Sequence, residues 1–221
     1  MTKLLYQGHA SMRITTNEGY VIYIDPFAGE GYNLPADLVL MTHEHFDHCN
    51  VYLMPEGPHA SFLKTNQWFR QDGQYCTYDL FGVHMQPVQA YNDHHNVHNC
   101  IGLVLDVDGI RIYHAGDTST TDAMKQGELA AMNIDYAFFP CDGRYNMNVA
   151  EASECAKLVQ AKHSTPIHTR GITNPNDTAQ LFDRSVAEQF QAEGRIILEP
   201  GEEIDDERPF GREPPEHVEA R

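Results

Sequence analysis

Residues 42–48 concentrate potential metal ligands so closely that they restrict how the chain can fold. The segment reads THEHFDH and places three histidines and an aspartate directly after the apolar run 38–41. Imidazole nitrogens and carboxylate oxygens are the ligands that zinc and similar divalent ions prefer. A straight strand cannot aim all four side chains at one ion, because successive side chains point to opposite faces. A loop must therefore curl them around two adjacent metals, or around one metal and a partner group.

The overall charge argues against polyanionic partners. The chain has 221 residues, enough for one substantial domain, and a formal net charge of −17 at pH 7. Such a surface repels phosphate backbones and anionic lipid headgroups, so we expect neither a nucleic-acid nor a membrane partner. We expect a small-molecule substrate, an anionic one included, and the sequence leaves a homo-oligomer open.

Cysteine usage and the lack of long apolar segments point to the cytoplasm. No run approaches the roughly 18–20 apolar residues that a membrane-spanning helix needs. The N-terminus also lacks a charged leader followed by a long apolar stretch. Five cysteines, an odd number without CxxC spacing, favour reduced thiols over a disulfide framework. We therefore expect a cytoplasmic protein.

Hydrophobic periodicity changes along the chain, with strands and hairpins first and strand–helix alternation later. We expect strands at 4–16, 20–25, 37–41, 83–91, 100–107, 110–115, 134–139, 165–168 and 195–198. We expect helices at 60–70, 121–132, 149–161 and 176–193. Two mixed sheets with helices outside them satisfy this order.

Further ligands should follow later strands if residues 42–48 supply part of a two-metal centre. Asp117 lies in a glycine-containing turn after a strand, where a helix cap is the alternative role. His168 follows another short apolar strand. His94, His95 and His98 share one loop, although a two-metal site needs only one more histidine. Periodicity does not choose among these three.

The order of these motifs resembles the metallo-β-lactamase superfamily. Shorter matches narrow the resemblance to its L-ascorbate-6-phosphate lactonase-like branch of metal-dependent hydrolases. They are GHAS at 8–11, IDPF at 24–27, AYN at 90–92 and YHAGDT at 113–118. The resemblance implies an α+β fold, a four-layer αβ/βα sandwich of two mixed β-sheets with outer helices. We expect this hydrolase domain to span residues 1–201, followed by an acidic C-terminal tail at 202–221.

The resemblance also implies a set of ligands, position by position. It assigns His43, His45 and His95 to one metal, Asp47, His48 and His168 to the other, and Asp117 to both as a bridge. His95 is favoured because related sequences place a histidine three residues after the AYN triplet; His94 and His98 remain alternatives. The cofactor would be two divalent metal ions. Histidine-rich ligation suits zinc best, and manganese or iron also fits a mixed site.

A pair of metals would generate a bridging hydroxide that attacks the substrate, with Asp47 and Asp117 as catalytic carboxylates. Arg144 lies in a loop expected at the active-site edge, where it would clamp a carboxylate or phosphate unless it forms an ordinary surface ion pair. Tyr91 and Asn92 are further candidates for lining the cleft. His9 matches a branch feature near the metals, in contact with substrate or behind the ligands.

The favoured function is a binuclear metal-dependent hydrolase acting on a small ester, lactone or phosphoester. The alternative is a phosphodiesterase acting on a nucleotide or phospholipid-type substrate. Redox chemistry at a di-iron site is a third hypothesis. His45 counts against it, since such relatives carry glutamate there, and so does the short chain. A degenerate binding module would show lost ligands, whereas every expected position here has a candidate.

Overall fold

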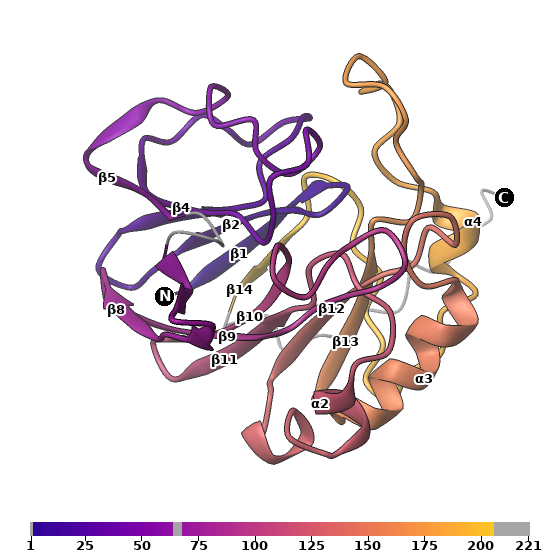
Figure 1. Cartoon of the computed structure of the whole chain (residues 1–221). Coiled ribbons are helices and arrows are strands. Elements are labelled where there is room, and N and C mark those ends of the chain that lie inside the picture. The colour runs from indigo at the N-terminus through magenta and orange to yellow at the C-terminus, as the bar shows by residue number, and fades with distance from the viewer. Residues whose placement is uncertain (1, 64–67, 206–221) are drawn as a thin grey trace, which may run out of the picture.

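Two six-stranded β-sheets pack face to face and enclose the main hydrophobic core (Figure 1). The computed structural model describes residues 2–63 and 68–205. The first sheet has the strand order β14-β1-β2-β3-β4-β5. Its strands are β1 (Lys3–Gly8), β2 (Ser11–Thr15), β3 (Val21–Ile24), β4 (Ala36–Leu40), β5 (Glu56–Leu63) and β14 (Glu203–Asp205). Strands β3, β4 and β5 are parallel, and the other neighbours are antiparallel.

The second sheet has the order β13-β12-β11-β10-β9-β8. Its strands are β8 (Tyr78–Leu80), β9 (Val83–Gln89), β10 (Ile101–Val107), β11 (Ile110–His114), β12 (Tyr136–Pro140) and β13 (His163–Ile167). Strands β11, β12 and β13 are parallel, so this sheet is mixed as well. A small hairpin of β6 (Arg70–Gln71) and β7 (Gln74–Tyr75) lies outside both sheets.

Alternation of side chains along the strands builds the core between the sheets. Ile22 and Ile24 of β3 face this core, whereas Tyr23 faces the opposite side. Leu103 and Leu105 of β10 enter the same core from the second sheet. Full burial of such a side chain stabilises the fold by about 1.5–3 kcal/mol, so this alternation fixes which faces of the two sheets meet.

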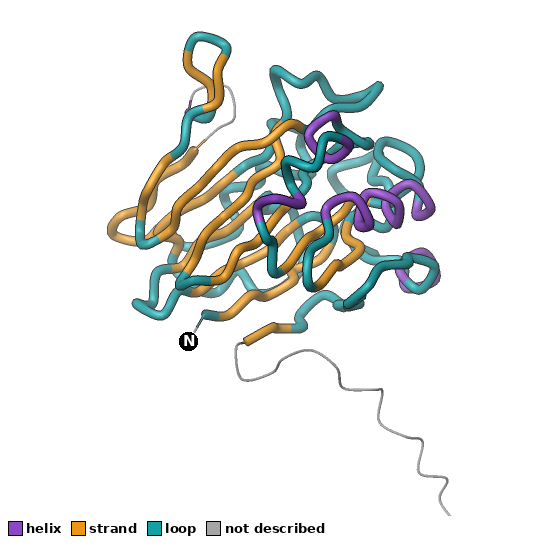
Figure 2. Tube along the Cα trace, turned by 90° about the horizontal axis from the view of Figure 1, so that it is seen from below, coloured by secondary structure: helices purple, strands orange, loops and turns teal. Residues whose placement is uncertain are grey.

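Helices cover the outer face of the second sheet. The longest is α3 (Val149–Val159), which packs Ala152, Cys155 and Val159 against that sheet. Two further helices, α2 (Asp122–Lys125) and α4 (Arg184–Ala187), are short, and a 3₁₀ turn lies at Ala130–Met132. Seen from below, the helices lie over and beside the strands (Figure 2).

Loops take the place of helices on the outer face of the first sheet, within the described part of the chain. Tyr32 and Met54 come from two such loops and pack against Tyr23 and Val39. The predicted α+β sandwich of two mixed sheets is therefore confirmed, with its outer helices on the side of the second sheet (Figure 1).

The predicted elements agree best where local patterns are strong. The hairpin across residues 108–109 is confirmed as β10 and β11, and the helix predicted at 149–161 is confirmed as α3. The strand predicted at 4–16 is interrupted, because Gly8 and His9 adopt left-handed backbone angles and start a turn between β1 and β2. The helix predicted at 121–132 splits into α2 and a 3₁₀ turn.

Three predicted elements differ from the structure. The helix predicted at 60–70 is wrong over residues 60–63, which belong to the strand Glu56–Leu63 beside β4, and at residue 70, which begins β6; residues 64–67 lie outside the described residues. Only Arg184–Ala187 of the helix predicted at 176–193 is α-helical, because the preceding loop instead packs Leu181 against Phe27. The strand predicted at 195–198 is reduced to a single bridge between Ser164 and Arg195.

The C-terminal end of the described chain belongs to the first sheet. Strand β14 pairs with β1, and Leu5 lies opposite Glu203. The boundary predicted at residue 201 thus precedes this edge strand, and residues 206–221 lie outside the described residues. Across the described chain, none of the helices combines the length and apolar character that crossing a membrane requires.

Candidate metal centre

The predicted ligands converge where loops leave the ends of four strands. The loop after β4 supplies residues 43–48, and the loop after β9 supplies His95. Asp117 follows β11, and His168 follows β13 directly. These strands come from both sheets, so the cluster lies between the two sheets at one edge of the sandwich.

Asp117 occupies the centre of the cluster. Its Oδ2 lies 3.3 Å from Nε2 of His95, 3.5 Å from Nε2 of His168 and 3.9 Å from Nε2 of His43. Its Oδ1 lies 3.4 Å from Nε2 of His48. One carboxylate therefore faces four imidazoles.

Two groups of ligand atoms lie around this carboxylate. His43, His45 and His95 each offer one nitrogen within 4.8 Å of the others. The second group consists of His9, Asp47, His48 and His168, with the same spacing limit. A further combination of Asp25, His43 and His48 overlaps both. The structure thus brings together all seven ligands that the sequence predicted.

Several buried atoms at the centre lack hydrogen-bond partners within the described residues. They are Nε2 of His43, Nε2 of His48, Nε2 of His168 and Oδ1 of Asp117. A buried polar group left without a partner costs about 1–3 kcal/mol, so such atoms are rarely left unsatisfied. Imidazole nitrogens and a carboxylate oxygen aimed at a common space suit divalent cations. The cluster is therefore able to hold metal ions.

Asp25 orients two of the imidazoles from behind. Its carboxylate oxygens accept hydrogen bonds from the Thr42 backbone N–H at 2.7 Å and the Thr42 hydroxyl at 2.6 Å. Oδ2 of Asp25 also lies 2.9 Å from Nδ1 of His48. Oγ1 of Thr42 in turn lies 3.0 Å from Nδ1 of His43. These contacts direct the Nε2 atoms of both histidines towards Asp117.

Asn92 determines which histidine of its loop faces the centre. Its Oδ1 accepts hydrogen bonds from the backbone N–H groups of His94 and His95 and lies 2.9 Å from Nδ1 of His95. Its Nδ2 donates to the backbone carbonyl of Tyr145 at 2.9 Å. His95 is consequently buried, whereas His94 and His98 are exposed.

Asp142 supports the last predicted ligand. Its Oδ2 lies 3.0 Å from Nδ1 of His168, and its Oδ1 accepts hydrogen bonds from the backbone N–H groups of Arg144 and Tyr145. Burial raises the pKa of Asp142, but the His168 imidazole and these donors outweigh that effect and lower it to about 2. Asp142 therefore stays ionised and holds His168 in place.

The buried imidazoles divide into two electrostatic classes. Burial lowers the pKa of His43 well below its usual range and that of His95 to about 4, against the opposing effect of Asp117. For His48 and His168, Asp117 and a second carboxylate outweigh burial and raise the pKa. Burial raises the pKa of Asp117, but the surrounding imidazoles outweigh burial and hold this pKa well below the usual range.

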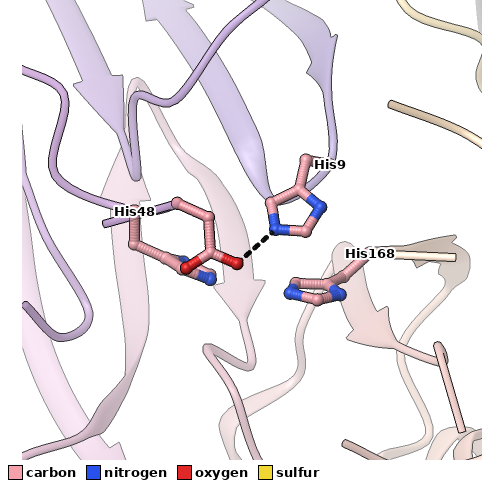
Figure 3. A group of neighbouring side chains, drawn as sticks. His9, His48 and His168 are labelled. Atoms are coloured by element: carbon pink, nitrogen blue, oxygen red, sulfur yellow. Dashed lines mark hydrogen bonds and ion pairs between the residues drawn. The ribbon is translucent and has the colours of Figure 1, made fainter. Parts of the chain in front are cut away.

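His9 reaches the centre from the turn between β1 and β2. Its Nε2 lies 3.1 Å from Oδ2 of Asp47, and its ring centroid is 3.7 Å from that of His168. Figure 3 shows His9, His48 and His168 close to one another, and its dashed line marks the contact of His9 with Asp47. Burial and the neighbouring His168 lower the pKa of His9 to about 4, against the opposing contact with Asp47. His9 is therefore neutral at pH 7, and its Nε2–H donates to the carboxylate.

Unusual backbone angles occur at three residues of the site. His9, Asp25 and His168 have φ values of 55°, 47° and 44°, in the left-handed region. Such conformations cost about 1–3 kcal/mol each and persist where the surrounding structure enforces them. Gly116 also has a positive φ, and a Cβ there would lie 2.4 Å from the Ile101 carbonyl oxygen. Only glycine fits immediately before the central aspartate.

A cavity of about 320 Å³ lies against the cluster. It is lined by His45, Phe46, Asp47, His94, His95, Asp117, Tyr145, His168, Ile172 and Thr173. A second cavity of about 230 Å³ shares His45, His94 and His95 with the first and extends towards Asn96 and Cys100. The predicted ligands thus border space in which a small molecule can bind.

Comparison with known proteins identifies the family. A family model described as a beta-lactamase superfamily domain matches residues 3–168, well over half of the chain. The chain belongs to the metallo-β-lactamase superfamily.

Individual members of the superfamily resemble the chain over nearly its whole length. A UPF0173 metal-dependent hydrolase of Methanoregula boonei is 30% identical over 221 residues, covering 91% of this chain and 97% of the relative. A UPF0173 metal-dependent hydrolase of Thermococcus onnurineus is 27% identical, covering 91% and 98%. The crystal structure of a putative metal-dependent hydrolase from Parabacteroides distasonis superimposes with a TM-score of 0.68 at 24% identity, covering 89% and 91%. This last likeness establishes the shared fold.

Four residues of this metallo-β-lactamase superfamily member are predicted to bind substrate. They lie around the cluster, and none of them lines the cavity of about 320 Å³. Arg144 is exposed, and its guanidinium lies 5.1 Å from the centroid of the Tyr145 ring. The Tyr91 hydroxyl accepts a hydrogen bond from the Asp122 backbone N–H. Asn92 contacts His94 and His95, and Nε2 of His9 contacts Oδ2 of Asp47. Their contact with substrate remains a prediction.

Sequence reasoning did not single out Asp25 and Asp142 as functional residues. Asp25 directly follows β3, and Asp142 follows β12 after one intervening residue, as several predicted ligands follow other strands. A carboxylate at the carboxyl end of such a strand is the signal that would have identified them. Phe46, Ile172 and Tyr145 gave no comparable signal, because an apolar cavity lining looks like ordinary packing in a sequence.

Proposed function

We propose that this protein is a metal-dependent hydrolase that cleaves a small ester, lactone or phosphoester at a centre of two divalent cations. The observation that carries the proposal is the position of Asp117, whose carboxylate faces four imidazoles at the junction of two ligand groups. Relatives covering nearly the whole chain are named metal-dependent hydrolases, which supports the same reaction class. The GHAS and YHAGDT motifs favour a lactone among these substrates.

The proposed ligands form two sets that share one residue. His43, His45 and His95 would hold one cation, Asp47, His48 and His168 the other, and Asp117 both. Nitrogen-rich ligation suits zinc, and the carboxylates also allow manganese or iron. When bound, two such cations supply Lewis acidity and lower the pKa of a shared water towards neutrality.

The protein's own residues prepare the site for this chemistry. Asp117 offsets part of the cationic charge and stays ionised, because the imidazoles hold its pKa well below the usual range. Burial raises the pKa of Asp47, but the His9 hydrogen bond and nearby imidazoles outweigh burial and lower it. Asp47 is therefore an ionised carboxylate beside the cavity, able to accept a proton from an attacking water.

The outer contacts reduce the freedom of these groups. Asp25, Asn92 and Asp142 each engage the Nδ1 of one imidazole, so the Nε2 atoms remain available to the centre. Outer partners of this kind typically change metal affinity or activity by about 10–100-fold when removed. These outer contacts would therefore hold the predicted ligands in place for metal binding.

Metal analysis followed by a substrate screen tests the proposal. Protein purified without chelator should contain about two divalent ions per chain, as expected for a two-cation centre. The reconstituted protein is then assayed with lactones, carboxyl esters, phosphomonoesters and phosphodiesters. Asp117→Asn should abolish hydrolysis while circular dichroism shows a preserved fold. A chain that binds no metal, or that hydrolyses equally well after complete chelation, would contradict the proposal.

A further inference from the structure

We propose that the substrate of this site carries no charge beyond its reacting bond and places a compact apolar group against Phe46 and Ile172. It is thus an uncharged ester or lactone, without a phosphate, carboxylate or ammonium group. This inference rests on the proposed function and narrows it to one substrate class.

An apolar wall borders the cavity beside the predicted ligands. Phe46 is 43% exposed, an unusual state for a large aromatic side chain in a loop of metal-ligand candidates. Its ring lies edge-on to Phe27, with the ring centroids 6.1 Å apart. Ile172 is held in a separate small core with Phe27, Ala28 and Leu181. The wall is therefore fixed in position and still presents Phe46 to a ligand.

Apart from the proposed cations, the side chains that line the cavity offer no fixed positive charge for a remote phosphate or carboxylate. None of its lining residues is a lysine or arginine. Two loops of the lining contain arginines, but neither arginine is among the residues that line the cavity. Arg144 lies over the Tyr145 ring, and Arg170 donates to both carboxylate oxygens of Asp177 at 2.6 and 3.1 Å. Proteins usually recognise remote anionic groups with free guanidinium or ammonium groups, so a remote anionic group of the substrate lacks its expected partner within this lining.

The net charge of the protein disfavours anions further. A chain of formal charge −17 repels negatively charged ligands during their approach. A cationic group is not favoured either, because both carboxylates of the lining are already engaged. Asp47 accepts from His9, and Asp117 is surrounded by imidazoles. If the remote part of the substrate is uncharged, no charged group of the substrate is left without a partner in the cavity.

The cavity also limits size. About 320 Å³ is at the lower end of the roughly 300–1,000 Å³ typical of small-molecule pockets. A phospholipid whose reacting phosphate lay at the centre would extend its acyl chains outside this space. The apolar wall and the limited volume together favour a compact ester or lactone.

Three aryl acetates with matched shapes test the inference on the metal-reconstituted full chain. They are the acetates of methyl 4-hydroxybenzoate, of 4-hydroxybenzoate and of 4-hydroxyphenyl-trimethylammonium, which differ mainly in remote charge. Each kcat/KM is divided by the rate of hydroxide-catalysed hydrolysis of the same ester, which removes differences in intrinsic reactivity. We expect the normalised value of the uncharged ester to exceed both others by about tenfold or more, equivalent to roughly 1.4 kcal/mol. An equal or higher value for either charged ester would overturn the inference.

A charge placed on the cavity rim should reverse the preference against anions. Thr173 is exposed and lines the cavity, so Thr173→Arg adds a guanidinium there. We expect the ratio of anionic to uncharged ester turnover to rise about tenfold, the size of one moderate charge contact. Thr178→Arg adds the same charge to an exposed position of the same loop outside the lining, and should leave the ratio unchanged. An unchanged ratio in Thr173→Arg would contradict the inference.

Equilibrium binding separates this inference from the proposed function. The three corresponding acetanilides carry the same remote groups on a slowly reacting amide, and calorimetry measures their binding to the metal-loaded protein. If no ester is hydrolysed by protein that contains metal, the proposed hydrolase function fails. Tightest binding of the uncharged anilide would support the inference even then. Tightest binding of a charged anilide, or no binding of any, would overturn it.

Discussion

His9 donates a hydrogen bond from Nε2 to Oδ2 of Asp47 across 3.1 Å, although 38 residues separate them along the chain. The His9 backbone is fixed as well, because its N–H donates to the Leu181 carbonyl and its carbonyl accepts from the His168 N–H. A single residue of the first turn thus connects the loop after β4 with the loop after β13. We expect His9 to act by positioning Asp47 and His168.

Replacing His9 by alanine should weaken the centre without unfolding the chain. His9→Ala removes the donor to Asp47 and the ring that packs on His168. We expect zinc affinity, measured by competition with a chromogenic chelator, to fall by about 10–100-fold, as for other outer partners of metal ligands. His84→Ala, at a partly exposed histidine that pairs with Asp79 outside the cavity lining, is the matched control. Wild-type zinc affinity in His9→Ala would contradict the positioning role.

The pH dependence of the metal-free protein should reveal the buried, neutral state of His9. Its folded pKa of about 4 lies below the ordinary value of 6.5, mainly because burial disfavours the charged ring. Between these two values the unfolded chain binds more protons than the folded chain, so stability falls as the pH is lowered through this window. His9→Asn cannot titrate there, and asparagine tolerates the positive φ of this position.

Urea unfolding of chelator-treated protein at pH 7 and pH 5 measures this effect. From pH 7 to pH 5, the wild type should lose about 2 kcal/mol more free energy of unfolding than His9→Asn. His48 and His168 have raised pKa values, so they change the stability in the opposite direction over this pH range. Both residues are present in the wild type and in His9→Asn, so their contributions to the free energy of unfolding cancel in the comparison. Identical pH dependence in both proteins would show that folded His9 protonates normally.

Alanine variants of the three neighbouring histidines should separate ligand from loop residue. His95 is buried 3.3 Å from Asp117, whereas His94 and His98 are exposed. We expect His95→Ala to lose about one of two bound ions and at least about 100-fold in kcat/KM, as loss of a direct ligand exceeds the outer-partner range. His94→Ala and His98→Ala should retain their metal content by mass spectrometry. Loss of metal from either of these two, with retention in His95→Ala, would overturn the assignment.

Much of the candidate site could be predicted because its chemistry is local. His43 to His48 lie in one loop, and Asp117 and His168 follow apolar strands, so residue type and position already indicate ligands. The hairpin of β10 and β11 is equally local, since its turn and alternation are visible over a dozen residues. Short-range patterns of this kind survive folding because tertiary contacts reinforce them.

The remaining features depend on contacts between distant segments. Asn92 selects His95 partly through its bond to the Tyr145 carbonyl, 53 residues away. The helix predicted at 176–193 fails because the loop packs Leu181 against Phe27, a contact that periodicity cannot anticipate. Asp25 gains its role only when β3 and β4 lie side by side, which places its carboxylate beside Thr42.

A comparison of two glycines should show how strictly the backbone before Asp117 is constrained. Gly116 and Gly109 both have positive φ, so alanine at either position is strained. A Cβ at Gly109 meets nothing within 4 Å, whereas one at Gly116 would lie 2.4 Å from the Ile101 carbonyl oxygen. Gly109→Ala should therefore cost about 1 kcal/mol in free energy of unfolding, the usual cost of alanine at positive φ. Gly116→Ala should cost at least about 2 kcal/mol more and lower zinc affinity, because relief of the overlap displaces Asp117. Urea denaturation and chelator competition measure both effects, and equal losses in the two variants would show that the turn yields without moving the aspartate.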